Sequence, residues 1–216
     1  MDARLRVLSD NLSNGVVYQM ISNREGTATQ FTYVSEPVRH VFGVAAEDVL
    51  ADANTIYSRV LPEDAPILAA KEAECQEKLQ ALQTEFRFIH SSGEIRWLRV
   101  TSSPRVLSDD WVAWDGFGID ITDGVRLRER DRFNIEFRTL VAELSAQFVR
   151  VKDKGEFDQA VDQALASLGE MFGVDRSYLF RFSPDLDLID NTHEWCAPGI
   201  STEKEHEQNL PTAELP

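Results

Sequence analysis

The feature that most constrains the fold is a run of strand-like sequence over residues 84–123. Phe86 and Phe88 alternate with charged residues, and this period of two gives a strand one apolar and one polar face. A Ser-Ser-Gly sequence then predicts a turn, and residues 95–101 are rich in β-branched and aromatic side chains. Pro104 and a Ser-Asp-Asp cluster are expected to break the ladder before a third strand at 111–121. The run therefore predicts three consecutive antiparallel strands, whose apolar face other elements must cover.

The preceding residues predict the covering elements. In order, we expect an amphipathic helix over 3–12, a strand pair at 16–22 and 30–34, several short helices between 36 and 60, and a longer helix over 65–81. Asp64 is placed to cap the longer helix. The predicted fold class is α+β, a five-stranded antiparallel sheet with helices on one face.

Several stretches of this region resemble the PAS, or sensory-box, family. They are FTYVSEPVRHVFGV, VLPEDAP, TEFRFIHSSGEIRWLRV and WDGFGIDITD, within roughly residues 5 to 123. The resemblance implies a sensory module with a cleft between the helices and the sheet. The candidate lining residues are Tyr33, Phe42, Ile56, Tyr57, Val60, Phe86, Phe88, Trp97 and Trp114. The alternative is that these side chains simply fill the core.

The end of the strand run is the expected point of signal coupling. The resemblance implies that Asp120, Ile121 and Thr122 connect the sheet to the following helix. Asp120 is expected to bond back to the strand–helix corner.

The cofactor is unknown, and we expect none. A haem would depend on Cys75, because the helix over 65–81 has no histidine. Covalent flavin photochemistry needs a cysteine that the stretch 54–61 lacks, whereas a non-covalent flavin could use Trp97 and Trp114 as a stacking pocket. Glycine spacing at Gly116 fits close packing rather than a phosphate loop.

A basic helix is predicted to follow the sheet, over residues 124–151. Six apolar residues recur at steps of three and four, as in a packed helix. Residues 125–155 carry eight basic and five acidic side chains, so this segment is positive although the chain has a net charge of −15. We interpret it as a linker or signalling helix, which is also a candidate first GAF helix. It is the expected route to a homodimer, and an ordinary domain helix is the alternative.

The remaining sequence predicts a helix over 156–172 and strands at 177–182 and 186–195. With the run NTHEWCAPGI, it resembles the opening of a GAF domain, as in bacterial PAS–GAF sensors. A GAF module has about six strands, so we expect an incomplete GAF-like α/β module. The predicted domains are therefore 1–123 (PAS), 124–151 (linker helix) and 152–216 (truncated GAF).

Other chemistry has little support. His193, Glu194, Cys196 and His206 do not form the paired clusters of a zinc site, so no metal is expected. No nucleophile–base pair or phosphate loop is present, which argues against an enzyme. The negative charge disfavours nucleic acid and direct contact with anionic membranes. Two distant cysteines and the lack of a signal-like or spanning apolar run favour a cytoplasmic protein.

The predicted function is the sensory input region of a bacterial signal-transduction protein, most simply a sensor histidine kinase of a two-component system. A small ligand or a partner would act through the PAS module and the helix that follows it. The alternatives are the input of a diguanylate cyclase or phosphodiesterase, a haem or flavin redox or gas sensor, and a ligand-free dimerisation module. We expect a fragment without an output domain.

Overall fold

The computed structural model describes residues 9–26, 28–108 and 110–212. The described residues divide into two compact units at the boundary between Arg128 and Glu129. Residues 3–8 of the expected N-terminal helix lie outside the described residues. Within the described residues, no helix combines the length and apolar character needed to cross a membrane.

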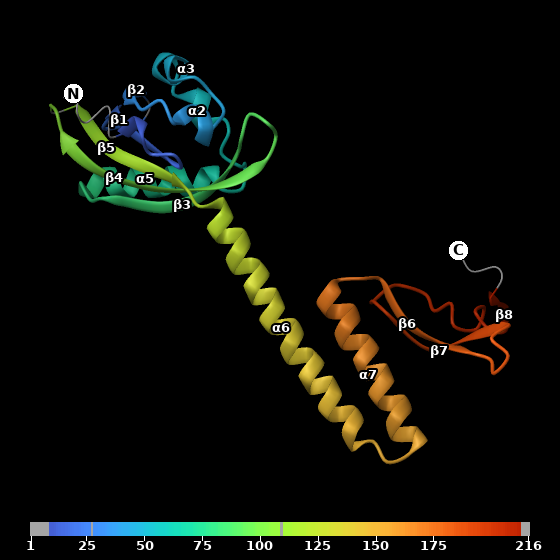
Figure 1. The fold of residues 1–216 in the computed structure, drawn as a ribbon. Coiled ribbons are helices and arrows are strands. Elements are labelled where there is room, and N and C mark those ends of the chain that lie inside the picture. Colours follow the sequence, from blue (N-terminus) through green and yellow to red (C-terminus); the bar gives the residue numbers. More distant parts are fainter. Residues whose placement is uncertain (1–8, 27, 109, 213–216) are drawn as a thin grey trace. The chain divides into compact units, whose positions relative to one another are not determined.

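A five-stranded sheet forms the frame of the first unit (Figure 1). Its order is β2-β1-β5-β4-β3, and every neighbouring pair is antiparallel, as predicted. The strands are β1 (Gly15–Asn23), β2 (Thr29–Val34), β3 (Leu82–Ile89), β4 (Ile95–Val106) and β5 (Trp111–Asp120).

The expected break at Pro104 is wrong, because β4 continues to Val106 and Pro104 lies opposite Trp114 of β5. On its other side β4 pairs with β3 only as far as Ser102. Pro104 therefore has a single neighbouring strand, where a missing N–H group is tolerated.

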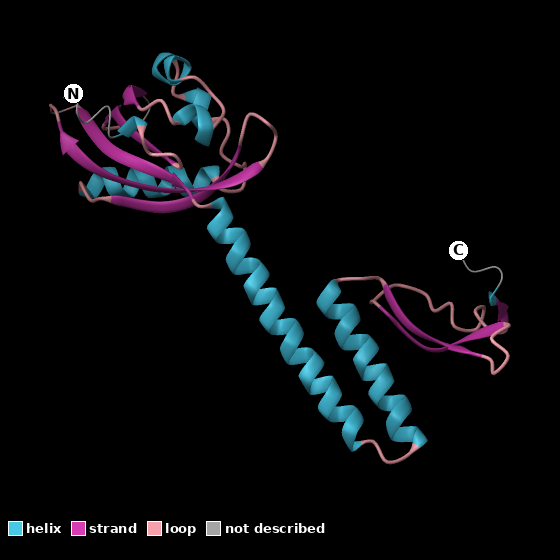
Figure 2. Cartoon of the chain, viewed as in Figure 1, coloured by secondary structure: helices cyan, strands magenta, loops and turns pink. Residues whose placement is uncertain are grey.

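Between β2 and β3 in the sequence come four helices of the first unit. Helices are cyan in Figure 2. They are α2 (Val38–Val41), α3 (Ala46–Ala51), α4 (Asn54–Tyr57) and α5 (Ala65–Lys78). Asp64 occupies the expected N-cap position of α5, but its side chain makes no capping hydrogen bond. Its carboxylate instead binds the Arg87 guanidinium at 2.6 and 3.0 Å and accepts the Arg87 backbone N–H at 2.8 Å. A bidentate arginine pair is a stronger partner than a free helix N–H group.

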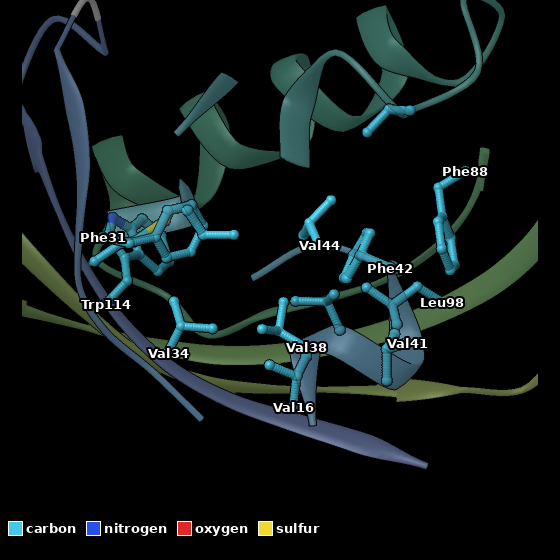
Figure 3. Packing of buried hydrophobic residues seen from close by; sticks show 14 of the residues in the cluster. Val16, Phe31, Val34, Val38, Val41, Phe42, Val44, Phe88, Leu98 and Trp114 are labelled. Carbon is cyan, nitrogen blue, oxygen red and sulfur yellow. The ribbon is translucent and has the colours of Figure 1, made fainter. Parts of the chain in front are cut away.

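The core lies between these helices and the sheet (Figure 3). Phe88 of β3 has no exposed surface and packs against Phe42 in a tilted arrangement, with ring centroids 4.5 Å apart. Val38 of α2 and Trp114 of β5 are also fully buried in this cluster. Burial of such large side chains supplies most of the driving force for folding.

The second unit contains most of α6 (Thr122–Arg150), which begins in the first unit, and α7 (Lys154–Phe172). Phe172 of α7 makes edge-on ring contacts with Phe133 and Phe137 of α6 at 5.9 and 6.0 Å. Part of the predicted apolar stripe therefore packs within the chain.

Reciprocal hydrogen bonds define the start of α7. The Asp153 side chain accepts the Glu156 N–H at 2.9 Å, and the Glu156 carboxylate accepts the Lys152 N–H at 2.8 Å. Such pairs satisfy backbone groups that the helix leaves free. The helix ends at Gly173, whose φ of 61° suits a left-handed cap.

A small antiparallel sheet follows α7, in the order β6-β7-β8. Its strands are β6 (Arg176–Phe182), β7 (Leu188–Cys196) and β8 (Leu210–Pro211). The Trp195 ring lies so close to Gly169 that a Cβ atom there would be 2.2 Å from the indole. This glycine therefore permits α7 and β7 to pack.

Candidate functional site

The first unit contains an apolar cavity of about 60 Å³ between the sheet and the helices. A water molecule needs roughly 10–15 Å³ on this measure, so the space corresponds to about four waters or to a small organic group. Valine, leucine and phenylalanine side chains make most of its wall. Three polar residues interrupt that wall: Tyr18, Tyr57 and Glu72.

Five of the nine predicted lining residues contribute to this cavity. They are Phe42, Ile56, Tyr57, Val60 and Phe86. Trp114 instead lines a neighbouring groove, which Tyr57 also borders.

The other three predicted residues lie away from the cavity. Phe88 is part of the solid core, and the Tyr33 hydroxyl is 2.8 Å from the Ser9 hydroxyl. Trp97 lies on the opposite face of β4 from Leu98, with the Arg87 guanidinium 5.8 Å from its ring centre. Trp97 and Trp114 therefore do not line a common stacking pocket.

Glu72 of α5 is the main charged feature of the cavity wall. The Tyr57 hydroxyl donates to its Oε1 at 3.1 Å and lies 3.7 Å from the Met20 sulfur. Burial raises the pKa of Glu72 to about 7, and the hydrogen bond from Tyr57 opposes this effect only in part. Burial also raises the pKa of Tyr18 to about 12. Near neutral pH, Glu72 is therefore poised between its two protonation states.

The groove beside the cavity has a volume of about 430 Å³. Met20, Tyr57 and Glu72 border both spaces, so they form the boundary between them. A hydrogen-bond chain fixes the wall of the groove. The Trp114 indole donates to the Ser22 hydroxyl at 3.1 Å, and that hydroxyl donates to the Gln76 side chain at 2.6 Å.

The predicted coupling residues form a hydrogen-bonded joint between β4, β5 and α6. Asp120 Oδ1 accepts the Thr122 N–H at 2.9 Å and the Thr122 hydroxyl at 2.5 Å. The bond expected at this corner is therefore present. The Thr122 hydroxyl accepts the Trp97 N–H at 2.9 Å, and the Ile121 N–H donates to the Trp97 carbonyl at 2.9 Å. Backbone groups of one β4 residue thus hold the start of α6.

Charged side chains extend this joint along the first turn of α6. Arg96 lies 3.5 Å from Asp120 and 2.8 Å from Glu94, which also binds Arg126 at 2.9 Å. Hydrogen bonds from both arginines lower the pKa of Glu94. Exposed pairs of this kind contribute little stability individually, so the backbone bonds are the firmer part of the joint.

The candidate metal residues of the second unit have other partners. His193 Nε2 lies 3.3 Å from Asp158, Glu194 accepts two backbone N–H groups, and the Cys196 thiol lies 3.6 Å from the Ser201 carbonyl. His206 is 81% exposed beside Glu203. Across the described residues, no three His, Cys, Asp or Glu side chains are grouped as metal ligands. Cys75, the candidate haem ligand, borders neither the cavity nor the groove.

Sequence reasoning missed Glu72 and Tyr18, although a signal for Glu72 was available. Leu68, Glu72, Cys75 and Leu79 follow one another at helical spacing, so a carboxylate occupies a position on the apolar stripe of α5. A charged residue on such a stripe indicates a partner or a function.

Comparison with known proteins identifies the family of the first unit. A family model described as "PAS fold" matches residues 31–114, which confirms the predicted PAS domain there. No curated protein matches the chain.

Several solved structures resemble part of the chain at low sequence identity. A PAS domain from Colwellia psychrerythraea is 17% identical, with 56% of this chain and 96% of that one covered and a TM-score of 0.44. The N-terminal domain of a diguanylate cyclase with PAS/PAC sensor from Marinobacter aquaeolei is 20% identical, with coverage of 50% and 95% and a TM-score of 0.41. A sensory box histidine kinase/response regulator from Burkholderia thailandensis is 19% identical, with coverage of 64% and 98% and a TM-score of 0.42.

Proposed function

We propose that the PAS domain of the first unit is the sensory input of a bacterial signal-transduction protein. A small ligand would occupy the cavity, and α6 would carry the response away from the sheet. One observation carries the proposal: a single strand, β4, serves both places. Leu98 and Val100 line the cavity, while the backbone of Trp97 bonds to Ile121 and Thr122 at the start of α6.

This arrangement suggests how an occupant would act on the helix. Leu98 follows Trp97 directly in the chain, so a displacement of the Leu98 side chain moves the peptide that bonds to the joint. The ligand must bind two arrangements of β4 with different affinities, because contact alone shifts no equilibrium.

The second unit supports the idea of a larger sensor. Its helix α7 followed by the antiparallel strands β6, β7 and β8 suits the opening of a GAF-like module. With the PAS domain before it, this order favours a sensor histidine kinase as the parent protein, and a diguanylate cyclase or phosphodiesterase is the alternative.

Dimerisation through α6 forms part of the same proposal. Ile135 and Val149 are 66% and 86% exposed and lie two heptads apart, so they share one face of the helix. Light scattering of the full chain should show a dimer. Replacing both residues by lysine should produce monomers, and an unchanged mass would contradict a dimer through this face.

Amide hydrogen exchange of the full chain tests the coupling. Val100→Leu adds one methylene at the cavity wall, whereas Thr101→Val changes the neighbouring residue on the opposite face of β4. Filling the cavity should change exchange at Ile121 and Thr122 by about threefold or more, and the control should leave it unchanged. Unchanged exchange at the joint, despite shifted Leu98 resonances, would refute the coupling.

A further inference from the structure

The acidic group on the cavity wall points to the chemistry of the ligand. We propose that the cavity takes a small organic cation, an aliphatic amine whose hydrocarbon body lies among the apolar side chains and whose ammonium group binds Glu72. The inference rests on the proposed function, because it names the class of ligand for that site.

The geometry places one carboxylate at the mouth of an apolar space. Glu72 lies on the boundary between the 60 Å³ cavity and the 430 Å³ groove, with Met20 and Tyr57 beside it. Tyr57 donates to Oε1 at 3.1 Å. In the described part of the chain no hydrogen bond or ion pair reaches Oε2, and no lysine or arginine pairs with Glu72.

The charges around this carboxylate leave it available to a cation. Within the cavity its titratable neighbours are the hydroxyls of Tyr57 and Tyr18, both of which stay neutral far above pH 7. The groove adds three charged side chains, Arg24, Glu25 and Glu77. Burial raises the pKa of Glu72, because the buried carboxylate is less stable when charged. Without a bound cation, the Glu72 carboxylate therefore takes up a proton more readily than an exposed one.

A cation replaces that proton at lower cost than any other ligand class. An ammonium group donates three hydrogen bonds, and its positive charge balances the negative charge of the partly buried carboxylate. A carboxylate ligand would meet a like charge, and an alcohol would offer one uncharged donor. The cavity volume suits a body of about four carbons, and the groove gives the polar end access to water.

Three probes of similar size and different charge test the proposal on the full chain: isobutylamine, isobutanol and isobutyrate. Binding is followed by NMR through the methyl groups of Leu98 and Val100. We expect isobutylamine to bind roughly tenfold more tightly than isobutanol, since hydrogen bonds to charged groups are the stronger ones. Isobutyrate should not bind. Equal affinity for amine and alcohol, or no entry of any probe, would overturn the proposal.

Two variants locate the charge preference. Glu72→Gln should reduce the affinity for isobutylamine to within about twofold of isobutanol, whose retained binding shows an intact cavity. Glu74→Gln removes an exposed carboxylate from the same helix and should leave the preference unchanged. A preference for the amine that survives Glu72→Gln would exclude the assigned site.

The pH dependence provides an independent readout. Below about pH 7 the empty site holds a proton that the amine must displace, so affinity should fall by up to tenfold per pH unit. The same titration in Glu72→Gln should be flat, and a flat wild-type profile would also overturn the proposal. If isobutylamine binds as described while exchange at Ile121 and Thr122 stays constant, the ligand class stands and the coupling function fails.

Discussion

Replacing Asp120 by alanine removes the side chain that joins the end of β5 to the first residue of α6. Its Oδ1 accepts both the backbone N–H and the hydroxyl of Thr122, at 2.9 and 2.5 Å. Thr122 is buried, so its freed donors gain little compensation from water. Oδ2 lies 3.5 Å from Arg96, a longer and more exposed contact.

The expected loss follows from these contacts. A helix-terminal N–H group without its side-chain acceptor costs about 1 kcal/mol, and the lost hydroxyl bond adds a similar amount. Asp120→Ala should therefore lower the free energy of unfolding of the first unit by about 2 kcal/mol. Asp120→Asn keeps the Oδ1 acceptor and loses only the charge, so it should cost about 0.5 kcal/mol.

Urea unfolding followed by tryptophan fluorescence measures this difference. Trp195→Phe as a common background leaves Trp97, Trp111 and Trp114, all in the first unit, as reporters. With a typical slope of about 2 kcal/mol per molar urea, the midpoint for Asp120→Ala should fall by about 1 M.

Two results would refute this reasoning about the joint. An unchanged midpoint for Asp120→Ala would mean that the bonds to Thr122 contribute no stability. An equal loss in Asp120→Asn would mean that the charge contact with Arg96, rather than the Oδ1 acceptor, holds the corner.

The remaining predictions concern a close contact and an ion pair. A Cβ atom at Gly116 would lie 2.7 Å from the Tyr18 ring. Gly116→Ala should therefore lower the stability measured by thermal unfolding by about 1–3 kcal/mol and shift the resonances of the cavity wall. The absence of both effects would contradict this packing. The hydrogen bond from Arg87 lowers the pKa of Asp64, so the pair stabilises the fold above about pH 4, and this contribution is lost as pH falls through the lowered pKa. Asp64→Asn should be less stable than wild type at pH 6 and approach it near pH 2; a constant difference measured by urea unfolding would contradict the assignment.

The sheet could be predicted because its signals are local. The alternation of Phe86 and Phe88 with charged residues predicts one face directed toward the core, and both side chains are buried. The pattern is ambiguous in β4, where the adjacent residues Trp97 and Leu98 are both apolar. A period of two therefore does not show which of them faces the core. The register with β3 settles it, since Leu98 lies opposite Phe86 on the same face.

The apolar part of the cavity was predictable, and the sequence marks Glu72 as a charged position on the apolar stripe of α5, but it does not show that Glu72 and Tyr18 line one cavity. Phe42, Ile56 and Val60 come from the region that the PAS resemblance assigns to the cleft, and all three line it. Glu72 and Tyr18 meet only through folding, because one lies on α5 and the other on β1. Their proximity comes from the tertiary packing of α5 and β1, so the spacing of residues along either element does not predict it.

The unbroken course of α6 has a consequence for how changes in its length act. An α-helix advances 1.5 Å and turns 100° with each residue. One residue inserted between Thr122 and Arg150 would therefore lengthen the helix slightly but rotate its far end by more than a quarter turn. Seven inserted residues would return it to within about 20° of its original azimuth. If α6 carries the response as proposed, we expect seven-residue insertions in this helix to be better tolerated than one-residue insertions, because they preserve its angular phase.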